Sequence, residues 1–306
     1  MSAEKDRISR LIKASAKNLG FDACGIAMAG PLLKESHIFR KWLKDGNHAG
    51  MSYMSRNVDK RLNPVLLNEW ACSVIMVLYN YYPTDSTLSE AKHKISKYAY
   101  GKDYHEIIKK KLRGLVDVIE DEIGEIMARV FVDSAPVMEK AWAVKCGLGW
   151  SGKNSCLINK EMGSFFFIGT IITNLELTYD KEELGEYCGS CTRCIDACPN
   201  GAIISPGIID SGKCISYLTI EHKGDLPEGY RDKLNGWIFG CDICQDVCPW
   251  NRFSKPHKEP AFNPLPQLSR MSKQDWEELD EKTFNALFDG TAVERAGYEK
   301  LKRNIE

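Results

Sequence analysis

Eight of the twelve cysteines lie in one stretch of the chain, between residues 188 and 248. The first run has the pattern C-x2-C-x2-C-x3-C-P over residues 188–199. Ferredoxins have this pattern: three of its thiolates bind one iron–sulfur cluster and the fourth binds a neighbouring cluster. The second run, C-x2-C-x3-C-P over residues 241–249, has the same ending but one thiolate fewer, and Cys214 stands alone between the two runs.

The two runs together predict two 4Fe-4S clusters that share their ligands crosswise. We expect one cluster on Cys188, Cys191, Cys194 and Cys248, and the other on Cys198, Cys214, Cys241 and Cys244. Zinc held by the C-x2-C pairs is the alternative, although zinc sites rarely use the first run. Two neighbouring clusters form an electron relay, so a further group must receive the electrons. The other four cysteines stand among apolar residues and are expected to be inert thiols: Cys24, Cys72, Cys146 and Cys156.

The segment GLGWSGKN, residues 147–154, fits the G-x-x-x-x-G-K part of a nucleotide-binding loop. Such a loop also needs Ser or Thr after the lysine to bind magnesium, and a strand before the glycines. Here Asn154 follows the lysine, and the preceding residues predict a helix. The sequence therefore argues against an ATP site.

Strand and helix patterns alternate through the first part of the chain. A first helix can end at Gly20, and strands are expected at residues 21–29 and 72–81. An amphipathic helix over 104–125, a strand over 128–133 and a helix over 137–147 follow. This alternation predicts an α/β domain over residues 1–173.

Gly, Pro and Cys replace the periodic segments after residue 173. Residues 174–256 are expected to form a ferredoxin-like domain that depends on its metal clusters for stability. Residues 257–306 begin with a proline-rich connector and are expected to end in a short helical segment. The predicted fold class is thus an α/β domain followed by smaller α+β parts.

Charge and hydropathy indicate a cytoplasmic protein without a membrane partner. The net charge is −1, so the overall field does not indicate a polyanionic partner, and the basic stretch over 92–113 is most simply a solvated helix face. The N-terminus lacks an apolar signal sequence, and the apolar stretch over 165–172 is far shorter than the roughly 20 residues that span a bilayer. In a reducing compartment we expect no disulfides.

Several further segments resemble the epoxyqueuosine reductases, cobalamin-dependent iron–sulfur enzymes of the last step of queuosine synthesis in tRNA. They occur in the order found in that family, around both cysteine runs. The segments are KYAYGKDYH (97–105), VDSAPVMEKAWAVKCGLGWSGKN (132–154), GSFFFIGTIITNLEL (163–177), CISYLTIEHKG (214–224) and FGCDICQDVCPWNRF (239–253).

The resemblance implies an oxidoreductase that binds cobalamin in the α/β domain, beside the nearer cluster, with no protein ligand on the lower face of the cobalt. The sequence agrees on one point. A corrinoid module with an axial histidine uses D-x-H-x-x-G, and here Asp103 and His105 are followed by Ile108 in place of the glycine. Without a donor ligand, reduction to cob(I)alamin is easier. Two electrons and two protons then convert the substrate's epoxide to an alkene and water.

By the same resemblance, Asp133 is the proton donor to the leaving oxygen, and burial against the corrin would raise its pKa. The plainer alternative is that Asp133 caps a helix that begins at Val137. The resemblance also implies a set of corrinoid contacts, for each of which a surface or core role is the alternative: Arg56, Lys97, Asp133, Lys153, Asn154, Ser155 and Ser216. Tyr104 and His105 are expected to line the same pocket or simply to pack.

The expected partners are tRNA that carries epoxyqueuosine in its anticodon stem-loop and a reduced flavodoxin or ferredoxin, and the expected state is a monomer. His222, Lys223 and Arg252 are candidates for phosphate contacts. Tyr100 and Phe165 stand where many family members have Arg and Trp, and many members continue past the position of Asn304 into a helical-repeat domain. We therefore expect tRNA contacts to depend on the cluster domain.

Two other functions remain open on sequence grounds. A reductive dehalogenase also combines a corrinoid with paired clusters, but those proteins usually carry a twin-arginine leader, which this sequence lacks. A plain two-cluster electron carrier would leave the N-terminal 170 or so residues without a purpose.

Overall fold

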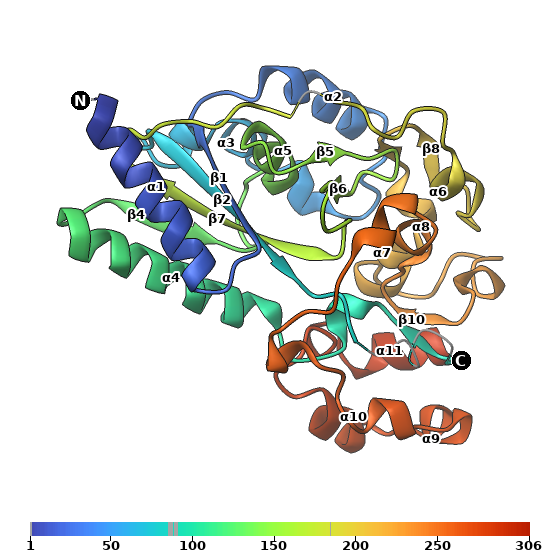
Figure 1. The fold of residues 1–306 in the computed structure, drawn as a ribbon. Coiled ribbons are helices and arrows are strands. Elements are labelled where there is room, and N and C mark those ends of the chain that lie inside the picture. The colour runs from blue at the N-terminus through green and yellow to red at the C-terminus, as the bar shows by residue number, and fades with distance from the viewer. Residues whose placement is uncertain (1, 85–87, 89–90, 184) are drawn as a thin grey trace.

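A four-stranded antiparallel sheet forms the centre of the N-terminal part (Figure 1). Its strand order is β1 (Ala23–Met28), β2 (Ser73–Asn80), β7 (Phe166–Thr173) and β4 (Ala128–Phe131). Every neighbouring pair runs antiparallel. The computed structural model describes residues 2–84, 88, 91–183 and 185–306.

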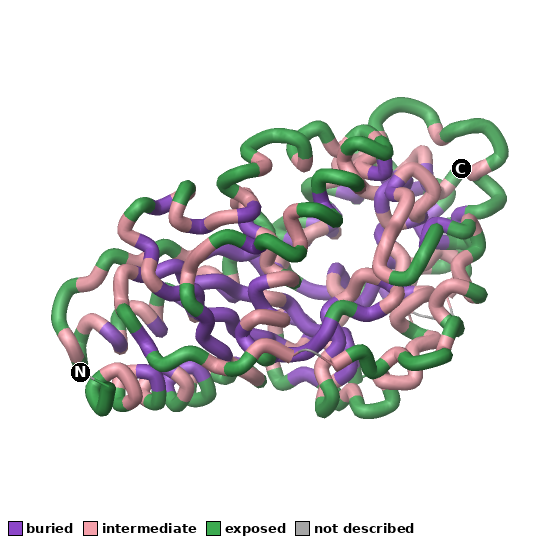
Figure 2. Tube along the Cα trace, turned by 90° about the horizontal axis from the view of Figure 1, so that it is seen from above, coloured by how far each residue is buried: buried purple, intermediate pink, exposed green. Residues whose placement is uncertain are grey.

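Helices cover both faces of this sheet (Figure 1). One face packs against α1 (Ser2–Asn18) and α4 (Tyr104–Ile123), and the other against α2 (Leu33–Lys44), α3 (Val58–Leu62) and α5 (Glu139–Lys145). The buried stretches in Figure 2 follow the sheet and the inner sides of these helices. The result is a three-layer α/β/α arrangement.

The sequence of the central strand β2 explains why both faces are covered. Side chains of a strand point alternately to the two faces of its sheet. In β2 both sets are apolar and completely buried or nearly so: Ile75, Val77 and Tyr79 face α1 and α4, whereas Val74, Met76 and Leu78 face α2, α3 and α5. A strand that is apolar on both faces is stable only between two layers.

The cysteine-rich part contains short elements only. These are α6 (Arg193–Asp196), β8 (Ile203–Ser205), β9 (Ile208–Ile209), α7 (Ile215–Ile220), β10 (Trp237–Phe239) and α8 (Ile243–Asp246). The helices α6 and α8, one from each cysteine run, lie against each other. Because these elements are so short, loops carry most of the cysteine side chains.

The C-terminal part is helical and docks onto the cysteine-rich part. It contains α9 (Lys273–Glu277), α10 (Glu281–Phe288) and α11 (Tyr298–Ile305). From α11, the buried side chain of Asn304 donates hydrogen bonds to the main-chain carbonyls of Thr219, at 3.0 Å, and Ile238, at 2.8 Å. These bonds hold α11 against α7 and β10.

The three parts are not separate in space. The short strand β3 (Lys94–Ile95) leaves the N-terminal part and pairs in parallel with β10. Ile95, Ala99 and Tyr100 then share a hydrophobic cluster with residues of the C-terminal helices. These contacts cross the predicted boundaries at 173/174 and 256/257, which stay predictions.

The predicted elements of the N-terminal part occur close to their expected positions. The strands expected at 21–29, 72–81 and 128–133 are β1, β2 and β4, each shorter at one or both ends, and the helix expected at 104–125 is α4. The helix expected from Val137 begins later, at Glu139. No helix among the described residues is long and apolar enough to cross a membrane.

Candidate functional site

Four cysteines from the two runs line one cavity. Its volume is about 220 Å³, and the thiols are those of Cys188, Cys191, Cys194 and Cys248. Trp250 and Tyr187 belong to the same lining, and both rings lie edge-on to that of Trp150. The cavity thus combines four thiols with an aromatic wall, the kind of apolar surroundings that influence the potential of an iron–sulfur cluster.

The other three cysteines of the runs, Cys198, Cys241 and Cys244, form a second group with Cys214. Burial, and after it the neighbouring thiols of Cys214 and Cys198, raise the pKa of the Cys241 thiol to about 12. Burial also raises the pKa of Cys214, whose thiol accepts backbone N–H groups of Tyr217 and Ser216. Such thiols become thiolates only when a metal group replaces their protons.

Cys244 belongs to this second group, and the thiol of Cys156 lies against the Cys244 thiol. A hydrogen bond between the two thiols lowers the pKa of Cys156 to about 7, despite burial. All twelve cysteines are free, so the expectation of no disulfides is confirmed.

The spacing of these side chains does not suit a single small ion. Within the described residues, no three His, Cys, Asp or Glu side chains gather closely enough to hold one metal ion. A zinc site needs four ligands at about 2.0–2.3 Å from one point.

The segment 147–155 joins the sheet domain to both cysteine loops. The Lys153 ammonium donates to the carbonyls of Gly189, at 2.7 Å, and Cys191, at 3.0 Å. The side-chain amide of Asn154 donates to the Cys244 carbonyl at 3.3 Å. The Ser155 hydroxyl donates to the Gly207 carbonyl at 2.7 Å. These three residues were predicted to contact a corrinoid, and that role stays a prediction.

The same segment does not form a nucleotide-binding loop. The helix α5 precedes it, and β5 (Trp150–Ser151) and β6 (Leu157–Ile158) fold into a small antiparallel hairpin around Lys153. A phosphate-binding loop would instead open a helix after the lysine. The structure agrees with the sequence in excluding this site.

Asp133 lies in an exposed turn just after β4. Its φ is +49°, in the left-handed region that Asp tolerates better than most residues. Its carboxylate accepts a hydrogen bond of 3.1 Å from the Tyr104 hydroxyl. The alternative that Asp133 caps the next helix is wrong, because α5 has Met138 at its N-cap and no side-chain cap bond.

A second carboxyl group lies directly behind Asp133. Both oxygens of Glu139 accept from the Asp133 backbone N–H, at 3.1 and 3.2 Å. The Thr170 hydroxyl donates to the same carboxyl at 3.4 Å. Burial and the charge of Asp133 raise the pKa of Glu139 to about 8. Glu139 was not singled out from the sequence, although it lies within the segment 132–154 that carries the family resemblance.

Tyr104 is held in place by its neighbours at the start of α4. Its ring stacks on that of Phe167 at a centroid distance of 4.1 Å and an interplanar angle of 6°, and on that of His105 at 4.1 Å. Asp103 caps α4 by accepting the His105 backbone N–H, and the Nδ1 atom of His105 lies 2.7 Å from the same carboxylate oxygen. Hence the DYH segment positions a tyrosine hydroxyl beside Asp133.

Lys97, another predicted corrinoid contact, lies in a buried ion-pair group. Its ammonium is 2.6 Å from an Asp246 carboxylate oxygen and 3.5 Å from one of Asp242, and only 8% of its side chain is exposed. Its backbone N–H also donates to Asp242 at 2.8 Å. Of the other predicted contacts, Arg56 is exposed in the loop before α3, and Ser216 lies in the first turn of α7.

Three residues that the sequence analysis missed lie around Asp133. Besides burial, the negative charge of Asp133 affects their pKa values: it acts to raise those of the Tyr53 and Tyr98 phenols and of the Arg61 guanidinium. The charge of Asp242, which follows the cluster cysteine Cys241, also raises the pKa of Tyr98. The Nε atom of Arg61 is buried and has no hydrogen-bond partner among the described residues. Tyr53 and Arg61 belong to no motif, so the sequence contained no signal for them, whereas Tyr98 lies within the segment 97–105 that carries the family resemblance.

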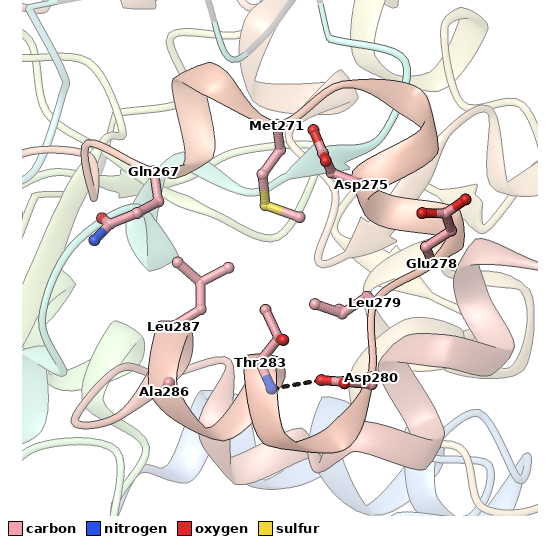
Figure 3. A pocket seen from close by; sticks show the side chains of 9 residues that line it. All are labelled: Gln267, Met271, Asp275, Glu278, Leu279, Asp280, Thr283, Ala286 and Leu287. Carbon is pink, nitrogen blue, oxygen red and sulfur yellow. Dashed lines mark hydrogen bonds between the residues drawn. The ribbon is translucent and has the colours of Figure 1, made fainter.

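A larger cavity lies elsewhere, in the C-terminal helical part (Figure 3). Its volume is about 490 Å³. Two of the acidic groups that line it are already used at helix starts, since Asp275 and Asp280 cap α9 and α10. None of the predicted site residues lines this cavity.

The comparisons with known proteins agree with this geometry. A family model described as "4Fe-4S double cluster binding domain" matches residues 187–251, and one described as "Epoxyqueuosine reductase QueG, DUF1730" matches residues 61–134. An epoxyqueuosine reductase of Cellulophaga algicola is 52% identical over 302 residues, which are 99% of this chain and 98% of that protein. The chain belongs to the epoxyqueuosine reductase family.

Solved structures of the epoxyqueuosine reductase family have the same fold. One is a crystal structure of epoxyqueuosine reductase with an epoxyqueuosine-modified stem loop of tRNA-Tyr. It matches with a TM-score of 0.88 at 28% identity, over 98% of this chain and 80% of that one. The reductive dehalogenase NpRdhA matches with a TM-score of 0.53 at 18% identity, over 99% of this chain and 39% of that one. This second match concerns the fold alone.

Proposed function

We propose that this chain reduces epoxyqueuosine to queuosine at the wobble position of tRNA. The reaction adds two electrons and two protons, opens the epoxide, forms the alkene and releases its oxygen as water. The observation that carries the proposal is the exposed carboxyl of Asp133, which accepts a hydrogen bond from the Tyr104 hydroxyl. Tyr98 lies near both this carboxyl and Asp242, the residue after the cysteine Cys241, because, besides burial, the charges of both carboxylates raise its pKa. Membership of the epoxyqueuosine reductase family supports the same activity.

The seven cysteines of the two runs, together with Cys214, are proposed to hold two 4Fe-4S clusters with crossed ligands. Three thiols of the first run and Cys248 of the second line a single cavity, which supports the first set. Besides burial, the thiols of Cys214 and Cys198 raise the pKa of Cys241, and those of Cys241 and Cys214 raise the pKa of Cys244 in addition to the larger effect of Cys156, which supports the second set. In this arrangement each run contributes to both clusters, so folding of the two loops is coupled.

The residues around Asp133 also fit a cobalamin. The unpaired buried Nε–H of Arg61 suits an acceptor-rich ligand, because corrin side chains carry amide oxygens. When bound, cobalamin supplies a strongly nucleophilic cobalt and the clusters supply its electrons. The predicted contacts through Arg56, Lys97, Lys153, Asn154, Ser155 and Ser216 belong to this proposal.

Within the site, Asp133 is the proposed proton donor to the leaving oxygen. Burial raises the pKa of Tyr104 far above its usual value, so the phenol stays protonated and donates to the Asp133 carboxylate. Tyr104 therefore orients the carboxyl without competing for the role of acid. A positioned general acid contributes about 10²–10⁴-fold to a rate.

The remaining proposals concern partners and location. We propose a reduced flavodoxin or ferredoxin as the electron donor, a monomeric enzyme, and a cytoplasmic location. For the tRNA, Lys223 and Arg252 are exposed and His222 is partly exposed, so all three remain candidates for phosphate contacts.

The test is anaerobic turnover of the isolated enzyme. Protein loaded with iron, sulfide and cobalamin should contain roughly eight irons, and with a chemical reductant it should remove one oxygen from an epoxyqueuosine anticodon stem-loop, as mass spectrometry can follow. Asp133→Asn should lower kcat by about 10²-fold or more. Asp121→Asn, at an exposed position of α4, is the matched control and should be unaffected. If the loaded wild-type enzyme does not convert the modified stem-loop, the proposed function is contradicted.

A further inference from the structure

Glu139 connects the start of α5 to the turn that carries Asp133. Its carboxyl group is partly buried, and both of its oxygens face the Asp133 backbone N–H, at 3.1 and 3.2 Å. On the other side it accepts the hydroxyl of Thr170, a completely buried residue of the central strand β7. The carboxyl thus lies between the rigid sheet and the turn.

The turn needs such a partner. The strand β4 ends at Phe131, so the Asp133 N–H lies beyond the sheet and has no strand partner. A left-handed φ of +49° at a residue other than glycine costs on the order of 1 kcal/mol or more unless its surroundings hold it. A hydrogen bond to a carboxyl group satisfies the N–H and offsets this cost.

Asp133 is therefore held at two points by two different elements. Tyr104 of α4 binds the carboxylate, and Glu139 of α5 binds the backbone. Loss of the first contact would free the side chain only. Loss of the second would loosen the exposed part of the turn, between the buried side chains of Val132 and Val137. Among the observed backbone hydrogen bonds, this part has one internal bond, from the Val137 N–H to the Ala135 carbonyl.

We infer that Glu139 is a positioning residue for the proposed acid: it holds the turn over residues 132–138 against the sheet, so that Asp133 points towards Tyr104. The effect of Glu139 on catalysis rests on the proposed function, whereas its effect on the structure of the turn does not. Glu139 itself does not need to touch the substrate.

The charge state of Glu139 sets the pH range of this contact. The groups that face it are Asp133 on the turn, Tyr104 on α4, the Thr170 hydroxyl on β7 and the neighbouring Lys140 on α5. Burial, and then Asp133, raise the pKa of Glu139 to about 8. Because this value lies above the 4.5 of an ordinary glutamate, the contribution of Glu139 to the closed turn is complete below pH 4.5, declines as the pH rises, and is lost by about pH 8. Ionisation would place two carboxylates side by side, which favours opening of the turn.

Two substitutions separate the hydrogen bond from the charge. Glu139→Gln keeps an acceptor for the Asp133 N–H and cannot ionise, whereas Glu139→Ala removes the acceptor. Hydrogen exchange of the peptide that covers residues 132–138, in the cluster-loaded protein, reports on the turn directly. We expect exchange in Glu139→Ala to be about 10-fold faster than in wild type, and exchange in Glu139→Gln to be no faster than in wild type.

As the pH rises towards 8, after correction for the intrinsic exchange rate, wild type should lose protection progressively and Glu139→Gln should keep it. In turnover with the modified stem-loop, Glu139→Ala should lower kcat by about 10–100-fold with little change in KM. Wild-type kcat should fall as the pH rises through 8, and that fall should be absent in Glu139→Gln. Thr170→Val removes the supporting hydroxyl at nearly the same volume and should give a smaller effect in the same direction.

Equal exchange in wild type and Glu139→Ala at matched iron content would overturn the inference. So would a Glu139→Gln variant as impaired as Glu139→Ala, because the negative charge rather than the hydrogen bond would then be responsible. If wild-type enzyme does not convert the stem-loop at all, the proposed function fails, while the exchange experiment still decides whether Glu139 holds the turn.

Discussion

Replacing Lys97 by methionine tests whether this residue stabilises the cluster loop or binds the cofactor. Its ammonium lies 2.6 Å from Asp246 and 3.5 Å from Asp242, and the side chains of Lys97 and Asp242 are 8% and 3% exposed. Lys97→Met keeps most of the side-chain volume and removes the charge. Asp242 is then left buried without its cation, next to the cluster cysteine Cys241.

The magnitude follows from the burial of the pair. At an effective dielectric constant of about 20, two charges 3.5–4 Å apart interact by about 4 kcal/mol, whereas the half-exposed partner Asp246 adds about 1 kcal/mol at most. Removing one member of a buried pair typically costs about 3–5 kcal/mol. Asp242 still accepts the backbone N–H of residue 97 and a bond from the Ser96 side chain, so we expect the lower end, about 3 kcal/mol.

The assay is thermal unfolding of cluster-loaded protein at one scan rate. For a chain of this size, about 3 kcal/mol corresponds to a fall of roughly 6 °C in Tm. Burial raises the pKa of Asp242 even with Lys97 present, so its neutral form is the better tolerated one and the loss should shrink as the pH falls. Lys97→Met combined with Asp242→Asn should recover most of the stability, because no unpaired charge remains.

Cobalamin affinity distinguishes the two roles. If Lys97 contacts the corrinoid, the double variant should regain its Tm and still bind cobalamin weakly. If Lys97 acts only through the cluster loop, both properties should return together. A single variant within about 1 kcal/mol of wild type would refute the assignment of a buried, energetically important ion pair.

Two further predictions concern the C-terminal helix and the cysteines. Asn304→Ala leaves two buried main-chain carbonyls without donors and should destabilise the protein by about 2–3 kcal/mol. The measurements are a lower Tm and faster proteolysis of α11. As the control, Asn285→Ala at an exposed position of α10 should change stability by less than about 0.5 kcal/mol. Cys214→Ser should lower the iron content from roughly eight to roughly four per chain, whereas Cys156→Ser should leave it unchanged. Equal iron contents in these two serine variants would contradict the proposed ligand sets.

The sequence was most informative where chemistry requires fixed spacing. The cysteine runs need short intervals so that one loop can present several thiols, and the structure brings Cys248 into one cavity with three thiols of the first run. The strands were also predictable. An apolar run such as residues 73–80 can be stable only between two layers, and β2 lies there.

Strand order and direction could not be predicted in the same way. Alternating strands and helices often form parallel sheets, yet β2, β7 and β4 pair antiparallel here. Parallel pairing requires a crossover that returns the chain to the same end of the sheet. In this chain the long connection between β2 and α4 instead leaves the sheet and pairs with β10 through residues 94–95. The local periodicity of the sequence does not predict the path of such a connection.

The contacts around Asp133 were unpredictable for a different reason. Glu139 is six positions away. On a helix the two side chains would lie on different faces, and on a strand they would share a side but lie about 20 Å apart. Only the left-handed turn brings its carboxyl back to the Asp133 N–H. Similarly, the capping role for Asp133 was a reasonable local expectation, and it fails because the chain makes this turn before α5 begins.

The segment from residue 132 to 155 links the proposed acid mechanically to the cluster loops. At its start, Glu139 of α5 holds the Asp133 turn, and at its end Lys153 and Asn154 bind carbonyls of the two cysteine runs. Between these points Lys140 donates from α5 to the Ser155 carbonyl at 2.9 Å, which fixes the helix to the hairpin. Because α5 packs on the rigid sheet through the buried Trp142, a shift of the cysteine loops cannot occur without straining contacts on both sides. One short stretch of sequence can therefore maintain the distance between the proton donor and the source of electrons.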